Sequence, residues 1–220
     1  MFKCINDNSF NFNFDSYLHV LSTDKLDQFE FYNSSINISL NVCKDIEVKT
    51  RLQSKNSFWF AQREYRLTSS NFGTFCKLRE STDPMKTFLQ KKLYFTSPSV
   101  RHSLENESLA FAKYVEKVND VTHCPVGLVI HPDLPFIGAS PDRLVYNSNS
   151  KELKLIEIKC PYSFHSKKTK IFQHVDLNTF ILKRQADGTL ALKDTHNYFY
   201  QIQGQLTLRT AKELKGAQPG

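Results

Sequence analysis

The sequence predicts an α/β fold in which helices come before and after a group of short strands. Residues 99–118 repeat apolar side chains every three or four positions, as an amphipathic helix does. Three short apolar runs between residues 124 and 161 are separated by Pro, Gly and Asn, which is typical of consecutive antiparallel strands forming a meander. Helical spacing returns over residues 196–209. A chain of 220 residues accommodates one ordinary domain with an appendage.

The chain has a basic excess and no pattern of a membrane span. Its 29 Lys and Arg residues outnumber 22 Asp and Glu residues, for a formal net charge of +7. This charge suits a polyanionic partner, although a solvated basic surface explains it equally well. Short basic runs at 90–92 and 166–170 are candidate contacts to a nucleic-acid backbone. Since no run approaches ~20 apolar residues, we expect a soluble intracellular protein, nuclear in a eukaryotic host and otherwise cytoplasmic.

Residues 1–50 are expected to form an N-terminal extension of unknown role, ahead of a main domain over residues 51–220. The extension is rich in Asn, Ser and Phe. Partial alternation of apolar side chains in NFNF, residues 11–14, and in NSSINISLNV, residues 33–42, predicts a strand or two, as an added hairpin; the alternative is a poorly ordered arm.

Helical signals open the main domain. The stretch SFWFAQRE, from Ser57, has aromatic side chains at helical spacing, and residues 68–70, Thr-Ser-Ser, are candidate caps for a helix over residues 70–80. Asp83-Pro84 predicts the start of another helix reaching residue 93, because proline is best tolerated in a first turn.

The helix predicted at 99–118 carries an acidic residue on its apolar stripe. Glu107 falls in step with the apolar positions, so the stripe comprises Leu104, Glu107, Phe111, Tyr114 and Val118. An inward carboxylate is costly unless it is paired, hydrogen-bonded or bound to a cation. The alternative is a carboxylate at the margin of the stripe.

The last of the three predicted strands carries an acid and a lysine side by side. Because side chains of a strand alternate between faces, Leu155, Glu157 and Lys159 share one face. Ile156 and Ile158 point to the other face. The alternative interpretation is a surface strand with an exposed ion pair, which contributes little to stability.

Two further carboxylates favour a functional interpretation of this pair. Asp142 ends the turn segment before the strand, and Glu107 lies on the preceding helix. Several carboxylates beside one lysine make an oxygen-rich site that suits Mg²⁺ or Mn²⁺. Lys159 would then hold, and help to deprotonate, a metal-bound water.

Asp142 and the tripeptide Glu157-Ile158-Lys159 resemble the (P)D…(D/E)xK core of the restriction-endonuclease-like nucleases. More narrowly, GASPDRL…IEIKCP, ENESLAFAKY and YFYQIQGQL resemble the YqaJ-type viral recombinases, the family of phage lambda exonuclease. The similarity spans residues 58–209. The tripeptide is weak evidence alone, whereas Glu-x-x-Ala, Ser-Pro-Asp, Glu-x-Lys-Cys-Pro and Gln-x-Gln in this order are specific.

The resemblance implies a restriction-endonuclease-like core, with a central mixed β-sheet flanked by α-helices. It implies that Glu107, Asp142 and Glu157 bind the metal, with the backbone carbonyl of Ile158 as a further ligand, and that Lys159 is the catalytic lysine. The implied cofactor is Mg²⁺, for which Mn²⁺ would substitute.

The resemblance also implies a pocket for a terminal 5′-phosphate. Arg63 and Ser70 match the family's arginine and the serine seven residues later, and Ser140 and Gln201 match its other phosphate-binding positions. Each residue alone also has an ordinary explanation: Arg63 as a surface charge, Ser70 as a cap, Ser140 as a turn residue and Gln201 as a polar helix position.

The function implied is a Mg²⁺-dependent deoxyribonuclease, namely a 5′→3′ exonuclease acting on duplex ends with a 5′-phosphate in recombination or repair. The alternatives are an endonuclease or structure-specific nuclease with the same core, and a catalytically silent DNA-binding domain of a mobile element. Implied partners are double-stranded DNA ends, a single-strand annealing protein and further copies of the chain, as in the family's trimeric rings.

The chain departs from the family at two places. Family members usually continue past the Gln-x-Gln helix into another strand, whereas residues 210–220 offer none, so the domain is either truncated or differently ended. Arg143 follows Ser-Pro-Asp where the family often has glycine.

Overall fold

The computed structural model describes residues 38–64, 66–79, 81–83, 97–132, 134–162, 175 and 180–210. The chain divides into two units, which are described separately. The first unit comprises Met1–Ile5, Leu93–Cys124 and Asp142–His196, and the second comprises Asn6–Lys92, Pro125–Pro141 and Asn197–Gly220. The helix predicted at 84–93, the basic runs and residues 211–220 lie outside the described residues.

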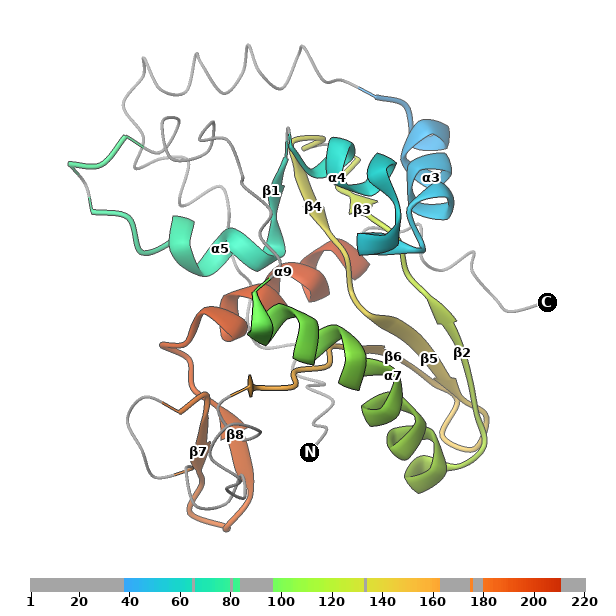
Figure 1. Ribbon diagram of the computed structural model, residues 1–220, viewed down its shortest axis with the longest axis vertical. Helices are drawn as coiled ribbons and strands as arrows, with labels where there is room; N and C mark the ends of the chain where they lie inside the picture. The colour runs from blue at the N-terminus through green and yellow to red at the C-terminus, as the bar shows by residue number, and fades with distance from the viewer. Residues whose placement is uncertain are drawn as a thin grey trace. The chain divides into compact units, whose positions relative to one another are not determined.

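The first unit contains one long helix, a three-stranded sheet and a hairpin (Figure 1). The sheet has the strand order β2-β5-β6, and β5 and β6 are antiparallel. Strands β7 and β8 form the hairpin. The elements are α7 (Pro98–Val118), β2 (Val121–Pro125), β5 (Arg143–Asn147), β6 (Glu152–Ile156), β7 (Leu182–Arg184) and β8 (Leu190–Leu192).

Helix α7 confirms the helix predicted at 99–118. Its cap residue Ser97 accepts a hydrogen bond from the Val100 N–H at 3.2 Å, and Pro98 takes the first turn, where its missing N–H costs nothing. The middle of the helix packs on the sheet through a cluster made of Phe111, Tyr114, Val145, Ile156 and Ile158.

The ends of the predicted apolar stripe are exposed, so the prediction is wrong for Leu104 and Val118. The reason is a difference in length. A strand of five residues spans about 17 Å, whereas a helix of 21 residues spans about 31 Å. The helix therefore overhangs the sheet, and only its middle turns are covered.

The alternation predicted for the last strand is confirmed. Ile156 and Ile158 are buried, whereas Leu155, Glu157 and Lys159 are partly exposed. Strand β6 nevertheless ends at Ile156, two residues before the buried Ile158. Ladder pairing with β5 stops there because the Ile158 N–H donates to the side chain of Asp142 instead of to a strand carbonyl.

The second unit combines helices with a mixed three-stranded sheet. Strand β4 pairs in parallel with β1 and antiparallel with β3. The elements are α3 (Leu40–Lys49), η1 (Gln53–Lys55), α4 (Ser57–Glu64), β1 (Leu67–Thr68), α5 (Ser69–Phe75), β3 (Val129–Ile130), β4 (Ile137–Ala139) and α9 (Asn197–Thr210). The predicted α/β class, with a mixed sheet and flanking helices, is confirmed.

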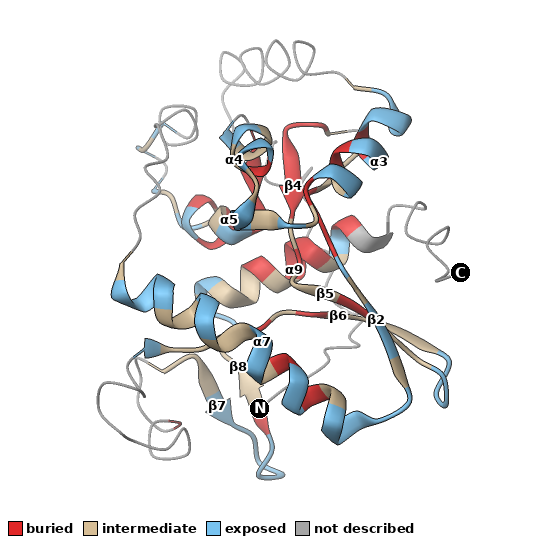
Figure 2. Ribbon diagram, turned by 45° about the vertical axis from the view of Figure 1, so that its right-hand side comes forward, coloured by how far each residue is buried: buried red, intermediate tan, exposed pale blue. Residues whose placement is uncertain are grey.

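Two apolar clusters hold the second unit together. Figure 2 shows buried backbone in red along β4 and on parts of α9. One cluster joins α5, β4 and α9 and includes Phe72, Ile137 and Leu208. Helices α5 and α9 pack closely at Gly204, where an added Cβ would stand 2.5 Å from the Phe72 ring. The other cluster joins α3, α4 and β3 and comprises Cys43, Ile46, Trp59, Leu128 and Ile130.

The strand predicted at 33–42 is wrong in its described part, because α3 begins at Leu40. Ser39 caps the helix by accepting from the Val42 N–H at 3.4 Å. Cys43 and Ile46, three residues apart, both face the buried cluster around Trp59. This tertiary packing outweighs the weak local alternation.

The three apolar runs do not form one meander. β3 pairs with β4 in one sheet, whereas β5 pairs with β6 in another. The second run is interrupted at residues 140–142, Ser-Pro-Asp, where Pro141 has no N–H to donate to a ladder. No helix in the described part of the chain is long and apolar enough to cross a bilayer.

Candidate active site

Three carboxylates and a lysine with predicted roles all belong to the first unit. Glu107 lies on α7, Asp142 immediately precedes β5, and Glu157 and Lys159 follow β6. They influence one another electrostatically, since Glu157, Glu107 and Lys159 all act on the pKa of Asp142. The sequence-predicted constellation is therefore brought together in one unit.

Glu157 and Lys159 form an ion pair. The Lys159 Nζ lies 2.5 Å from Glu157 Oε1, and the side chains are 28% and 10% exposed respectively. The exposed surface pair considered as an alternative does not describe Glu157, which is close to buried. A carboxylate in this position needs a nearby cation, and Lys159 supplies it.

Glu107 is paired with a residue that sequence reasoning did not assign to the site. Arg143 Nη1 lies 3.4 Å from Glu107 Oε1 and donates to the Asp142 carbonyl at 2.6 Å. Its guanidinium also stands 5.4 Å from the centre of the Phe111 ring. The available signal was its position beside Asp142, at the first ladder pair of β5. Arg143 thus places a fixed positive charge against the Glu107 carboxylate and holds the backbone carbonyl of Asp142.

Asp142 is the most perturbed carboxyl of the cluster. Its Oδ2 accepts a hydrogen bond from the Ile158 N–H at 2.5 Å. Burial, followed by the charges of Glu157 and Glu107, raises the pKa of Asp142 to about 8, against the opposing effects of the Ile158 N–H and Lys159. In the absence of a further cation, Asp142 therefore holds a proton up to about pH 8.

The carboxylates fit a divalent cation by their chemistry, although they are not arranged as a ligand set. Among the described residues, no three Asp, Glu, His or Cys side chains are gathered closely enough to hold a metal ion. Glu107 and Glu157 are instead engaged by Arg143 and Lys159. Burial, and then the charges of Glu157 and Glu107, raise the pKa of Asp142, and a hard cation at its carboxylate would oppose both effects. The Ile158 carbonyl stays a prediction as a ligand.

The four residues predicted for phosphate binding belong to the second unit. Two of them are in contact: Arg63 Nη2 donates to Ser70 Oγ at 3.2 Å, from α4 to α5. The Thr68 hydroxyl lies 3.1 Å from the same Ser70 oxygen. Ser70 is exposed, so its hydroxyl is accessible to a ligand.

Trp59 links this pair to Ser140. Its Nε1–H donates to Ser140 Oγ at 3.0 Å, and the Arg63 guanidinium lies 4.1 Å from the centre of its ring. Trp59 itself is part of the core, since the residue is 9% exposed and packs in the cluster with Cys43 and Ile46. Its indole N–H and ring face additionally orient two predicted phosphate ligands, a role that sequence reasoning missed.

Gln201 is buried on the face of α9 that packs against α5. The neighbouring positions Asn197 and Gly204 mark this face, because a Cβ on Gly73 would meet Asn197 and a Cβ on Gly204 would meet Phe72. Residues 197, 201 and 204 follow one helical stripe. The predicted Gln-x-Gln helix is confirmed, and the role of Gln201 stays a prediction.

Residues 58–212 match the family model of the YqaJ-like viral recombinase domain. No curated protein sequence matches the chain. Solved structures similar to the chain include three with TM-scores below 0.5.

The first is LHK-Exo in complex with dAMP, with TM-score 0.44 and 18% identity over 71% of this chain and 70% of that one. The second is the alkaline exonuclease LHK-Exo from Laribacter hongkongensis, with TM-score 0.39 and 18% identity over 73% and 98%. The third is a SOX–DNA complex, with TM-score 0.45 and 16% identity over 88% and 64%.

Proposed function

Because the chain belongs to the family of YqaJ-like viral recombinase domains, we propose that it is a metal-dependent deoxyribonuclease. Its substrate would be duplex DNA with a 5′-phosphorylated end, digested in the 5′→3′ direction during recombination or repair. The observation that carries this proposal is the cluster of Glu107, Asp142, Glu157 and Lys159 in one unit, with the pKa of Asp142 raised by burial and then by the charges of Glu157 and Glu107.

Glu107, Asp142 and Glu157 would hold the divalent cation, with the Ile158 carbonyl as a candidate fourth ligand. When bound, the cation supplies charge stabilisation at phosphate oxygens and lowers the pKa of a coordinated water. Lys159 keeps a positive charge beside Glu157 and is partly exposed, so its Nζ can donate to a water or to a phosphate oxygen. The role of Glu157 toward Lys159 is to orient this ammonium group.

The second unit would hold the terminal phosphate. Arg63 offers a guanidinium whose direction is restrained by the Trp59 ring and by Ser70. A guanidinium with adjacent hydroxyl groups is suited to a phosphate dianion. Ser140 and Gln201 are proposed as further donors. Binding a strand end instead of a strand interior would give the enzyme its exonuclease polarity.

Comparing three substrates tests this function. With Mg²⁺, a linear duplex with 5′-phosphates should release nucleotides faster than one with 5′-hydroxyls, and closed circles should stay intact. Arg63→Ala should remove the preference for the 5′-phosphate, whereas Arg79→Ala, at an exposed arginine of the same unit, should keep it. Cleavage of circles would instead indicate an endonuclease. A folded protein that binds DNA and cuts none of these substrates would be a silent DNA-binding domain.

Two partners follow from this function as proposals. The exposed 3′ strand is the substrate of a single-strand annealing protein, and a homo-oligomer such as a trimeric ring would enclose the duplex. The molar mass of the protein in solution tests the second proposal directly.

Replacing Arg143 is expected to increase affinity for divalent cations. Arg143 competes with a metal for Glu107, which it approaches to 3.4 Å. Arg143→Gln should therefore lower the Kd for Mn²⁺ by about 3- to 10-fold, as expected for loss of one nearby like charge. Isothermal titration calorimetry measures this effect. Arg101→Gln, on an exposed part of the same helix as Glu107, is the control; equal affinities for all three proteins would contradict the competition.

A further inference from the structure

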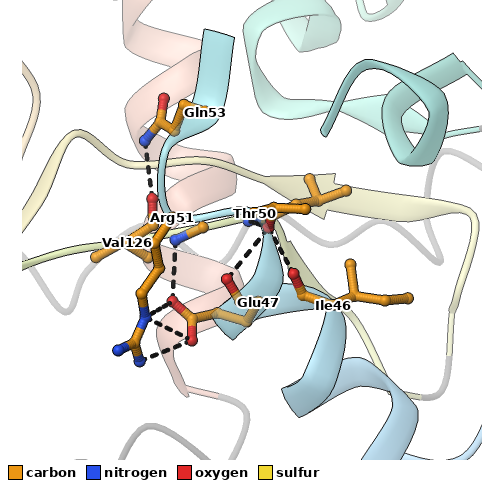
Figure 3. A network of polar contacts seen from close by, with 8 residues as sticks. Ile46, Glu47, Thr50, Arg51, Gln53 and Val126 are labelled. Carbon is orange, nitrogen blue, oxygen red and sulfur yellow. Dashed lines mark hydrogen bonds and ion pairs between the residues drawn. The ribbon is translucent and has the colours of Figure 1, made fainter. Parts of the chain in front are cut away.

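Gln53 joins two segments of the second unit that are distant in sequence. Its side-chain Nε2 donates to the Val126 carbonyl at 2.8 Å and to the Pro141 carbonyl at 2.9 Å. These partners are 73 and 88 residues away along the chain. Both N–H groups of one carboxamide are thus used to hold two backbone oxygens (Figure 3 shows the bond to Val126).

The first partner of Gln53, Val126, lies in a segment that is held by other hydrogen bonds as well. At the end of α3, Glu47 Oε1 accepts from the Gly127 N–H at 2.9 Å, and Thr50 Oγ1 accepts from the Leu128 N–H at 2.7 Å. Figure 3 shows this network, in which Arg51 also pairs with Glu47. Residues 126–128 are therefore held by α3 at two other points, so they do not depend on Gln53 alone.

The Pro141 carbonyl has no comparable support among the bonds of the network. Proline lacks an N–H, so its carbonyl is the one backbone group through which Pro141 can be held by a hydrogen bond. On its other side, Ser140 is held through its hydroxyl by Trp59. Gln53 and Trp59 thus fix consecutive residues of Ser-Pro-Asp, one at the backbone and one at the side chain.

Fixing the Pro141 carbonyl constrains Asp142. The carbonyl of Pro141 and the N–H of Asp142 belong to one planar peptide unit. A bond that orients this carbonyl therefore orients the plane from which the Asp142 Cα, and then its carboxylate, extends. Asp142 is the residue with the most perturbed carboxyl in the acidic cluster.

The backbone of Gln53 supports a specialised role. Its φ is 46°, a left-handed conformation that is uncommon for glutamine and more readily adopted by asparagine or glycine. Neither asparagine nor glycine offers a carboxamide of the same reach. The hydrogen bonds of the Gln53 carboxamide to Val126 and Pro141 therefore offset the cost of the unfavourable backbone conformation.

We propose that Gln53 is a positioning residue for Asp142, acting through the Pro141 carbonyl. This inference rests on the proposed function, in which Asp142 is a ligand of the divalent cation. Outer contacts that orient metal ligands commonly change metal affinity or activity by about 10- to 100-fold when removed. Loss of the Gln53 contact should therefore weaken metal binding and turnover while leaving the affinity for DNA unchanged.

Two variants separate this role from general stability. Gln53→Asn favours the left-handed backbone but is one methylene too short to reach both carbonyls, so it should fold well without holding Pro141. Gln53→Leu keeps the size of the side chain and removes its donors. Arg51→Ala is the matched control, because it removes the ion pair with Glu47 from the same network and leaves the Gln53 contacts in place.

The measurements are the Kd for Mn²⁺ by electron paramagnetic resonance, the kcat and KM for a 5′-phosphorylated duplex, and the melting temperature. We expect both Gln53 variants to raise the Kd for Mn²⁺ and lower kcat by about 10-fold or more with KM little changed, and Arg51→Ala to change the melting temperature alone. Wild-type Kd and kcat in Gln53→Asn, or equal losses in Arg51→Ala, would overturn the inference.

The two proposals fail in different ways. A wild-type protein that binds Mn²⁺ in a Gln53-dependent manner and cuts no DNA would overturn the proposed function and support the positioning role. If the wild type and the Gln53 variants cut DNA equally well, the proposed function would be supported and the positioning role of Gln53 would be overturned. A folded wild type that binds no Mn²⁺ would overturn both.

Discussion

Lys159→Ala is expected to lower the rate of Mg²⁺-dependent DNA hydrolysis by about 10²- to 10⁴-fold, the range typical of a lost proton-transfer or charge-stabilising group. Lys159 provides the ammonium group paired with Glu157 at 2.5 Å, and its side chain is partly exposed and thus accessible to substrate. The binding of DNA should change little, because the substrate is held by many phosphate contacts. Single-turnover digestion of a labelled linear duplex measures the loss.

The chain offers a closely matched control on the strand that precedes Lys159. Lys154 and Glu152 form an ion pair at 2.7 Å with the same two-residue spacing, five residues earlier in β6. Lys154→Ala removes this pair without approaching Asp142 and should leave hydrolysis near the wild-type rate. If Lys154→Ala and Lys159→Ala were equally slow, or if Lys159→Ala kept full activity, Lys159 would have no special role.

Asp142→Asn is expected to abolish hydrolysis and at the same time to stabilise the metal-free protein at alkaline pH. The folded-state pKa of Asp142, about 8, exceeds its ordinary value of 3.8. The stabilising contribution of Asp142 to the free energy of unfolding is therefore fully present below pH 3.8. This contribution is lost as the pH rises to about 8. Asparagine carries no charge and retains an oxygen that can accept from the Ile158 N–H.

Urea unfolding of metal-free protein between pH 5 and 9 measures this difference. The free energy of unfolding of Asp142→Asn should exceed that of the wild type at pH 9 by on the order of 3 kcal/mol, and the gap should narrow toward pH 5. Glu152→Gln, at a carboxylate outside the cluster, is the control and should produce no such gap. If the difference in free energy of unfolding between the wild type and Asp142→Asn did not change with pH, the pKa of Asp142 would not be raised in the folded protein.

Local patterns predicted those elements whose burial follows from neighbouring positions. The period of α7 and the alternation of residues 155–159 are properties of short windows, and both are confirmed. Helix α3 was missed, since its burial of Cys43 and Ile46 depends on Trp59 and Leu128. Those partners are remote in sequence, and no window around residue 40 contains them.

The same distinction holds for the candidate site. Glu157 and Lys159 were predictable as neighbours because they are two residues apart on one face. Arg63 and Ser70, which the resemblance to the family implies as a pair, are in contact across α4 and α5, and no local pattern predicts this contact. The pairing of Arg143 with Glu107 requires α7 to lie against the start of β5, a tertiary relation without a local pattern. Gln53 was missed for the same reason.

Metal dependence of DNA cleavage is the most direct test of the central claim that these carboxylates and Lys159 form a nuclease site. A 5′-phosphorylated linear duplex is incubated with the protein in EDTA, and Mg²⁺ is then added in excess. We expect no nucleotide release in EDTA and immediate release after Mg²⁺ addition, with release by Lys159→Ala absent in EDTA and slower by about 10²-fold or more with Mg²⁺. Release in EDTA, or the absence of release by folded wild-type protein with Mg²⁺, would contradict the claim.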